Sequence, residues 1–192
     1  AAAKLEIYPD GQSSALKQAI AEVHGLNPAN IVCGNGSDEL LGLLAHTYLS
    51  PGDEGIFTEH GFLVYKIQIM AQGATPVVVK ETAETANVDA ILAAVTAKTK
   101  IVFLANPNNP TGASYPRALL EAIVELARQH RLVLLADEIY DGILFDDARF
   151  QPLAVLAGDH PCITFGGLSK VHRACGYRVG WLTVSGRESR LA

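Results

Sequence analysis

The sequence lacks the features typical of disulfide-rich, metal-binding, nucleic-acid-binding and membrane proteins. Its 192 residues include three cysteines, Cys33, Cys162 and Cys175, whose odd number and spacing suit neither a disulfide framework nor a metal site. We therefore expect reduced thiols, a cytoplasmic protein and no metal. Charged residues are 18% of the chain, the net charge is −5 and no basic stripe occurs, which argues against nucleic-acid binding. No apolar run is long enough to span a bilayer, and we expect neither a membrane segment nor a signal peptide.

What is present is a regular alternation of short apolar runs and helical periodicities. Such an alternation predicts βαβ units and a mostly parallel sheet, covered on both faces where a run is wholly apolar. We expect one α/β domain over residues 1–192, a three-layer αβα structure without repeats or linkers. Strands are predicted at 30–33, 55–58, 75–79, 101–105, 132–136, 162–165 and 179–184, and helices at 14–24, 40–48, 63–72, 88–97 and 115–130.

Polar motifs follow several of these strands. Because ligands bind outside the carboxyl ends of the strands in an open α/β sheet, such motifs indicate a binding site. A lysine in such a crevice can lose part of its hydration and become a nucleophile toward a carbonyl, and a glycine-rich turn before a helix can bind an anion. The motifs are residues 36–38, 106–112, 137–140 and 167–170.

Each motif also has a purely structural interpretation. Ser37 or Asp38 can be only a helix N-cap, and Lys170 a solvated loop residue. Asp137 can be a helix cap and Tyr140 a core residue. Phe62, an aromatic residue before an apolar helix, is of a type that usually belongs to the core, and Pro110 can mark only a turn.

The motifs together resemble the class I/II aminotransferases, the fold-type I enzymes that depend on pyridoxal 5′-phosphate (PLP). The resemblance is carried by Asn-Asn-Pro-Thr-Gly (108–112), Ala-Asp-Glu-Ile-Tyr (136–140), Leu-Ser-Lys (168–170) and Gly-Tyr-Arg-Val-Gly-Trp (176–181). Residues 8–11, 36–39 and 59–62 look most like histidinol-phosphate aminotransferases, whereas 165–181 look closer to alanine-type aminotransferases. The resemblance implies the large domain of that family and an enzyme of amino-acid metabolism that acts on an amino acid and a 2-oxo acid.

The resemblance also implies a role for individual residues. Lys170 would form the Schiff base with PLP and move the substrate proton, Asp137 would keep the pyridine nitrogen protonated, and Asn109 and Tyr140 would bind the 3′-oxygen. Phe62 would stack on the ring. The phosphate would be bound by Gly36, Ser37, Asp38, Ser169 and Arg178, and Tyr8 would reach the phosphate of the neighbouring subunit in a homodimer. His172, Arg173 and Cys175 receive no role.

The length departs from the pattern, because family members are considerably longer. The small domain, which supplies the arginine for the substrate carboxylate, is expected to be largely absent, and the large domain incomplete. Two hypotheses follow: an aminotransferase with activity impaired by the missing segments, or a truncated or engineered PLP-binding domain with little or no turnover. A domain without cofactor is a third.

Overall fold

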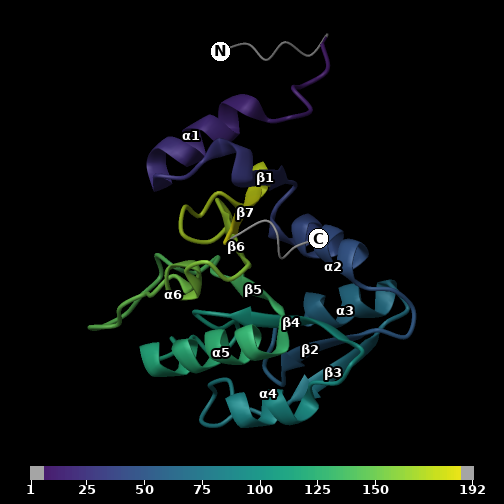
Figure 1. Ribbon diagram of the computed structural model, residues 1–192. Coiled ribbons are helices and arrows are strands. Elements are labelled where there is room, and N and C mark those ends of the chain that lie inside the picture. Colours follow the sequence, from purple (N-terminus) through teal and green to yellow (C-terminus); the bar gives the residue numbers. More distant parts are fainter. Residues whose placement is uncertain (1–6, 187–192) are drawn as a thin grey trace.

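The computed structural model describes residues 7–186 and arranges them around one seven-stranded sheet (Figure 1). The order across the sheet is β1-β7-β6-β5-β4-β2-β3. Strands β6, β5, β4, β2 and β3 are parallel to one another, whereas β7 runs antiparallel to both β6 and β1. The predicted, mostly parallel sheet is therefore confirmed. The strands are β1 (Ile31–Gly34), β2 (Glu54–Thr58), β3 (Thr75–Val79), β4 (Thr99–Ala105), β5 (Val133–Asp137), β6 (Cys162–Gly167) and β7 (Gly180–Ser185).

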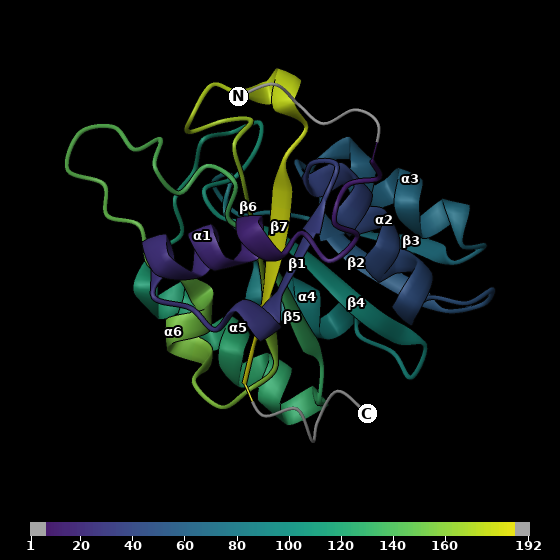
Figure 2. The same ribbon diagram turned by 90° about the horizontal axis from the view of Figure 1, so that it is seen from above.

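Helices cover both faces of this sheet. Figure 2 shows α2 and α3 on one face and α1, α5 and α6 on the other, and α4 packs with α5 on that second face. This is the three-layer αβα arrangement that the sequence predicts. The helices are α1 (Ser14–His24), α2 (Ser37–Tyr48), α3 (Leu63–Ala71), α4 (Val88–Ala94), α5 (Arg117–His130) and α6 (Leu153–Ala157), with short 3₁₀ helices η1 (Pro28–Asn30) and η2 (Cys175–Tyr177).

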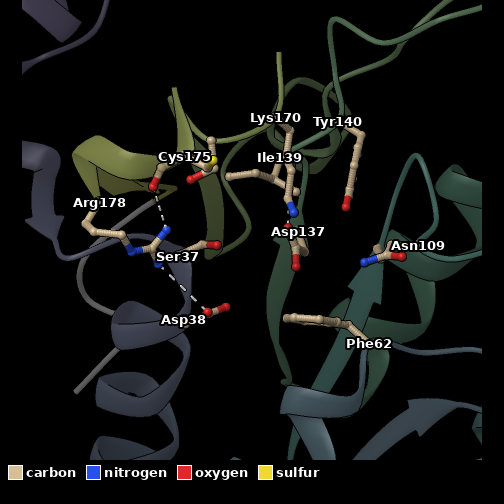
Figure 3. A pocket seen from close by; sticks show the side chains of 12 residues that line it. Ser37, Asp38, Phe62, Asn109, Asp137, Ile139, Tyr140, Lys170, Cys175 and Arg178 are labelled. Carbon is tan, nitrogen blue, oxygen red and sulfur yellow. Dashed lines mark hydrogen bonds and ion pairs between the residues drawn. The ribbon is translucent and has the colours of Figure 1, made fainter. Parts of the chain in front are cut away.

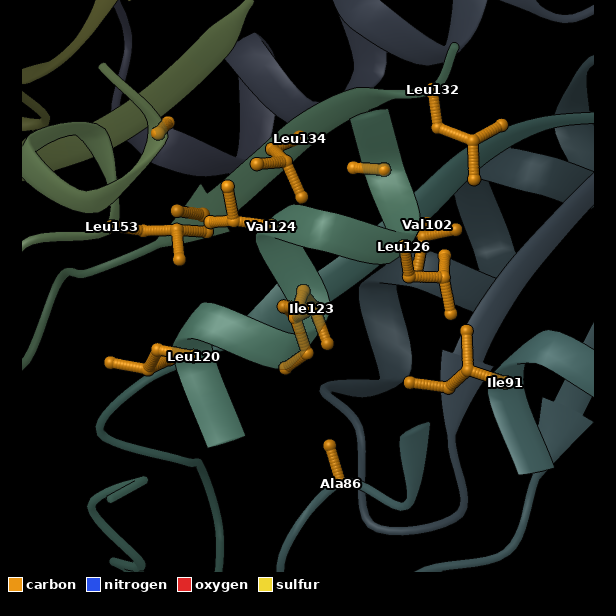
Figure 4. Packing of buried hydrophobic residues seen from close by; sticks show 14 of the residues in the cluster. Ala86, Ile91, Val102, Leu120, Ile123, Val124, Leu126, Leu132, Leu134 and Leu153 are labelled. Carbon is orange, nitrogen blue, oxygen red and sulfur yellow. The ribbon is translucent and has the colours of Figure 1, made fainter. Parts of the chain in front are cut away.

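Strand β4 shows how the two cores arise from one apolar run. Successive side chains of a strand point to opposite faces. Ile101 and Phe103 pack in the core under α2 and α3, whereas Val102 and Leu104 pack in the core under α5. A strand buried on both faces has no polar alternation, which is why the sequence at 101–105 is continuously apolar. Figure 4 shows the second core.

Helix α5 contributes the widest apolar face to that core. Leu120, Ile123 and Val124 are all buried there (Figure 4). The helix begins at Arg117 rather than at the predicted residue 115, because Pro116 occupies the N-cap and a residue before proline is disfavoured in the helical conformation.

Other boundaries also differ from the prediction, most of them by one residue. Helix α4 ends at Ala94 instead of residue 97, since Val95 already has an extended backbone. Strand β6 continues two residues further, through Gly167. The five-residue α6 was not predicted at all, because it is too short to show a helical period. Within residues 7–186, no helix combines the length and the apolar character that crossing a membrane would require.

Candidate active site

Three glycines lie side by side at the edge of the sheet where β6 ends. Gly180 of β7 pairs with Gly34 of β1 on one side and with Gly167 of β6 on the other. A Cβ atom at Gly180 would lie 2.5 Å from the carbonyl carbon of Gly36 and 2.6 Å from the nitrogen of Ser37. The row of glycines therefore lets the first turn of α2 lie directly against the sheet edge.

The turn before α2 is held by side chains other than those predicted to cap it. The N-cap is Gly36, with φ 87°, and it has no side-chain cap, while Ser37 and Asp38 lie inside the helix. Glu39 instead accepts a hydrogen bond from the Asn35 N–H at 2.7 Å. Because neither Ser37 nor Asp38 occupies the N-cap position, the capping interpretation is wrong. The first N–H groups of a helix lack intrahelical acceptors, so this end suits an anion.

Arg178 lies over the same turn. A Cβ atom at Gly36 would lie 2.6 Å from its Nη2 atom. The guanidinium donates to the carbonyl oxygens of Cys175 (3.1 Å) and Asn35 (3.4 Å) and lies 4.0 Å from the carboxylate of Asp38. Figure 3 shows it at the same end of the pocket as Ser37 and Asp38. A guanidinium beside the first N–H groups of a helix is well suited to a phosphate.

Asp137, the last residue of β5, is a buried carboxylate in the middle of the site. Its Oδ2 atom accepts a hydrogen bond from the Tyr65 hydroxyl at 2.7 Å, and its Oδ1 atom accepts one from the Ile139 N–H at 3.4 Å. Burial raises the pKa of Asp137, and the hydrogen bond from Tyr65 opposes that rise. Turn residues rather than a helix follow Asp137, so it caps no helix.

The side of the pocket away from Arg178 is formed by Lys170 together with two aromatic side chains and one amide side chain. Lys170 follows β6, and its Nζ atom lies 5.6 Å from the centre of the Tyr140 ring. Figure 3 shows Lys170 and Tyr140 pointing into the pocket, with Asn109 at its side and Phe62 at the end opposite Lys170. Phe62 lines the pocket and also packs against the core, so the core interpretation holds, while its stacking on a cofactor ring stays a prediction.

These side chains enclose a cavity of about 110 Å³. That is of the same order as the roughly 150 Å³ cavity that accommodates a benzene ring, so it suits a small aromatic ligand better than an ion alone. The sequence did not single out three of its lining residues, Ala105, Ile139 and Cys175, for the site. The predicted residues that line it are Ser37, Asp38, Phe62, Asn109, Asp137, Tyr140, Ser169, Lys170 and Arg178.

Four other residues named from the sequence do not line the cavity. Gly36 contributes its backbone beneath Arg178 rather than lining the cavity. Tyr8 is 97% exposed and lies outside the cavity lining, so its role toward a neighbouring subunit stays a prediction. His172 and Arg173 are exposed and do not line the cavity either.

Tyr65 and Glu138 are buried residues with polar side chains to which the sequence assigned no role. Tyr65 lies 72 residues before its partner Asp137, so no local pattern connects the two. Glu138 points away from the cavity, as expected from its place next to Asp137, and accepts a hydrogen bond from the Leu153 N–H at 2.7 Å. Burial raises its pKa to about 8. Glu138 therefore secures α6 rather than taking part in the site.

Comparison with known proteins agrees with this geometry. The model of the family "aminotransferase class I and II" matches residues 1–189. The chain belongs to this family. The fold is that of the large domain of fold-type I aminotransferases, as the sequence predicts.

Individual relatives are aminotransferases of several kinds. A histidinol-phosphate aminotransferase of Nitrobacter winogradskyi is 46% identical over 182 residues, which are 95% of this chain and 50% of the relative. An alanine aminotransferase of Pyrococcus furiosus has a TM-score of 0.90 at 29% identity, over 96% of this chain and 49% of that one. An aminotransferase of Escherichia coli has a TM-score of 0.85 at 36% identity, over 92% and 45%. The chain thus spans about half the length of the relatives it matches.

Proposed function

We propose that residues 1–192 form one PLP-binding domain of an aminotransferase acting on an amino acid and a 2-oxo acid, with Lys170 as the covalent anchor of the cofactor. The observation that carries the proposal is the arrangement within one cavity. A buried carboxylate, Asp137, lies between the Arg178 and α2 end and the Lys170 and Tyr140 end. Family membership supports PLP as the cofactor.

The residues present fit this cofactor at its phosphate end. The absence of a side chain at Gly36 and Gly180 keeps the backbone of the α2 turn beneath Arg178. We propose that the N–H groups of Ser37 and Asp38, the hydroxyl of Ser169 and the guanidinium of Arg178 bind the phosphate. The carboxylate of Asp38 lies 4.0 Å from that guanidinium.

The residues also fit the ring. When bound, the protonated pyridine ring withdraws electrons from the α-carbon of the substrate. Asp137 would hold the proton on the ring nitrogen, because a carboxylate buried away from water is best satisfied by a cationic partner. Asn109 and Tyr140 would donate hydrogen bonds to the 3′-oxygen, and Phe62 would pack against the ring face, worth about 0.5–1.5 kcal/mol beyond burial.

Lys170 has two tasks in this proposal. Its Nζ atom would hold the cofactor covalently and then, once released by the incoming amino acid, would carry the proton from the substrate α-carbon. Tyr140 lies against the same amine and would orient it. We further propose a cytoplasmic homodimer in which Tyr8 reaches the phosphate of the neighbouring subunit.

A second candidate function is cofactor binding with little turnover. Within the described part of the chain, Arg178 is the one arginine that lines the cavity, and it lies at the phosphate end. The described residues would therefore offer the substrate carboxylate no arginine of its own. Positioning of a substrate contributes several kcal/mol to a reaction barrier, roughly 7–11 kcal/mol in well-oriented cases, so binding would survive this loss better than transamination.

The test is covalent trapping. The purified chain is incubated with PLP, reduced with borohydride and weighed by intact mass spectrometry. We expect one cofactor-sized adduct in the parent chain and in the matched variant Lys98→Ala, whose lysine is exposed and outside the cavity. Lys170→Ala should give no adduct, and an adduct that persists in it would refute the anchor.

Conversion of the bound cofactor to its amine form separates the two candidates. A panel of L-amino acids is added to the loaded chain, and the absorbance of the aldehyde form is followed. Conversion by any member at a useful rate supports an aminotransferase. Retained absorbance with every amino acid supports the binding domain.

A further inference from the structure

Tyr65 is a buried tyrosine fixed on two sides by aromatic rings. It lies in the first turn of α3 and is 1% exposed. Its ring stacks on Phe103 of β4, with centroids 4.8 Å apart and planes 10° from parallel, and meets the ring of Phe62 edge-on at 5.9 Å. A ring clamped in this way can move little, so its hydroxyl has a fixed position.

That hydroxyl donates to Asp137. The distance from the Tyr65 oxygen to Oδ2 is 2.7 Å, within the range of hydrogen bonds to an ionised acceptor. Burial raises the pKa of Tyr65 well above its ordinary value, so the phenol keeps its proton and acts as the donor. The other hydrogen bond to this carboxylate, from the Ile139 N–H, is much longer at 3.4 Å.

We propose that Tyr65 is a positioning residue for Asp137: its hydroxyl fixes the buried carboxylate in its ionised form and in the orientation that meets the ring nitrogen of the cofactor. The inference rests on the proposed function. Through its contact with Phe62, the same side chain also supports the residue against the ring face. Tyr65, which lies outside the cavity lining, thus positions two residues of the lining, Asp137 and Phe62.

The surroundings of Asp137 show why such a donor is needed. Burial and the negative charge of Asp38 both favour the neutral carboxyl group and raise its pKa. Tyr65, the Ile139 N–H and the positive charge of Lys170 oppose this. Of these three, the hydrogen bond from Tyr65 opposes the rise most, and it is present before any cofactor binds. A neutral Asp137 would leave the ring nitrogen without its counter-charge.

The test compares Tyr65→Phe with Tyr115→Phe. The first removes only the hydroxyl and keeps the stacked ring. The second makes the same chemical change at another buried tyrosine, 4% exposed and outside the cavity lining. We expect Tyr65→Phe to weaken PLP binding at pH 8 by about 10- to 100-fold, the value of a hydrogen bond to a charged group, and Tyr115→Phe to leave it within a factor of about two.

A double-mutant cycle separates positioning from general damage. If Tyr65 acts through Asp137, the loss from Tyr65→Phe should disappear in an Asp137→Ala background. An equal loss in both backgrounds would overturn the inference, because it would mean that Tyr65 acts only on the overall structure. Thermal unfolding of each cofactor-free variant shows whether it is folded.

A measurement without cofactor keeps this result apart from the proposed function. The carboxyl carbon of Asp137, assigned with Asp137→Asn, is titrated by NMR in the cofactor-free chain. It should protonate at higher pH in Tyr65→Phe than in the parent, whereas a fluorinated tyrosine at position 65, a stronger donor, should move it lower. An unchanged titration overturns the inference whether or not PLP binds, and failure of the parent chain to bind PLP overturns the proposed function alone.

Discussion

Replacing Gly180 with alanine places one methyl group against the backbone of the turn before α2. The Cβ atom would lie 2.5 Å from the carbonyl carbon of Gly36 and 2.6 Å from the nitrogen of Ser37. Ordinary contacts between such atoms are about 3.5–4.0 Å, so strand and turn must separate by about 1 Å. Backbone cannot rotate out of the way as the end of a side chain can, and the whole turn must move.

The displacement has a cost in stability and a cost in binding. Overpacking of this kind destabilises a protein by about 1–3 kcal/mol, which for a chain of this length lowers the melting temperature by roughly 2–12 °C. A shift of about 1 Å also carries the Ser37 N–H out of hydrogen-bonding range of a phosphate. Losing one such charge-assisted bond should weaken PLP binding by about 10- to 100-fold.

Gly176→Ala is the matched control for this experiment. Gly176 has an ordinary negative φ, and a Cβ atom there would meet nothing within 4 Å. Thermal unfolding and PLP titration by absorbance are measured for both variants and the parent chain. If Gly180→Ala melts and binds PLP as Gly176→Ala does, the close approach of α2 to the sheet edge is not what the phosphate site depends on, and the reasoning is refuted.

Two further predictions concern buried and exposed titratable groups. Burial raises the pKa of Glu138 to about 8, whereas the same carboxyl group in the unfolded chain loses its proton above about pH 4.5. Because the folded chain binds this proton more tightly, the free energy of unfolding should fall by a few kcal/mol between about pH 5 and 8. Glu138→Gln, which still accepts from the Leu153 N–H, should flatten that fall in urea unfolding at several pH values, and an unchanged slope would contradict the assignment. Among the thiols, exposed Cys175 should react first with a maleimide and be protected by PLP, because it lines the cavity. Buried Cys162 should stay unlabelled in the folded chain, and early labelling there would contradict its burial.

The sequence predicted the layers and most elements of the fold because each rests on a local pattern. The apolar run at 101–105 and the helical spacing in α5 are strong signals of this kind. The end of β6 was missed for a different reason. Gly166 and Gly167 read as the end of a strand, yet they continue to pair with Trp181 and Gly180 of β7. At Gly166 the missing side chain makes room for the Trp181 indole, a long-range contact that the glycine alone does not reveal.

In the candidate site, too, some residues could be predicted from the sequence and others could not. Residues at strand ends, such as Asp137 and Lys170, were found because a parallel sheet gathers strand ends at one edge. Their supports were not found. Tyr65 sits in an apolar helix with the spacing of an ordinary core residue, and its hydroxyl acquires a role only when β5 is placed beside β4. The Gly34–Gly180–Gly167 row likewise exists only once β1 and β7 are paired.

We expect the described residues to supply the contacts that cofactor binding needs. The groups proposed to line the cofactor site come from α2, from the segments that follow β2, β4, β5 and β6, and from Arg178 before β7. The contacts that position them, from Tyr65 to Asp137 and from Gly180 to the α2 turn, lie within residues 7–186. Cofactor binding therefore depends on packing that these residues supply themselves. Under the proposed function a substrate carboxylate would need a cationic group near Lys170, whereas Arg178, the arginine that lines the described cavity, lies at the other end. Variants that disturb the glycine row or Tyr65 should thus weaken cofactor binding.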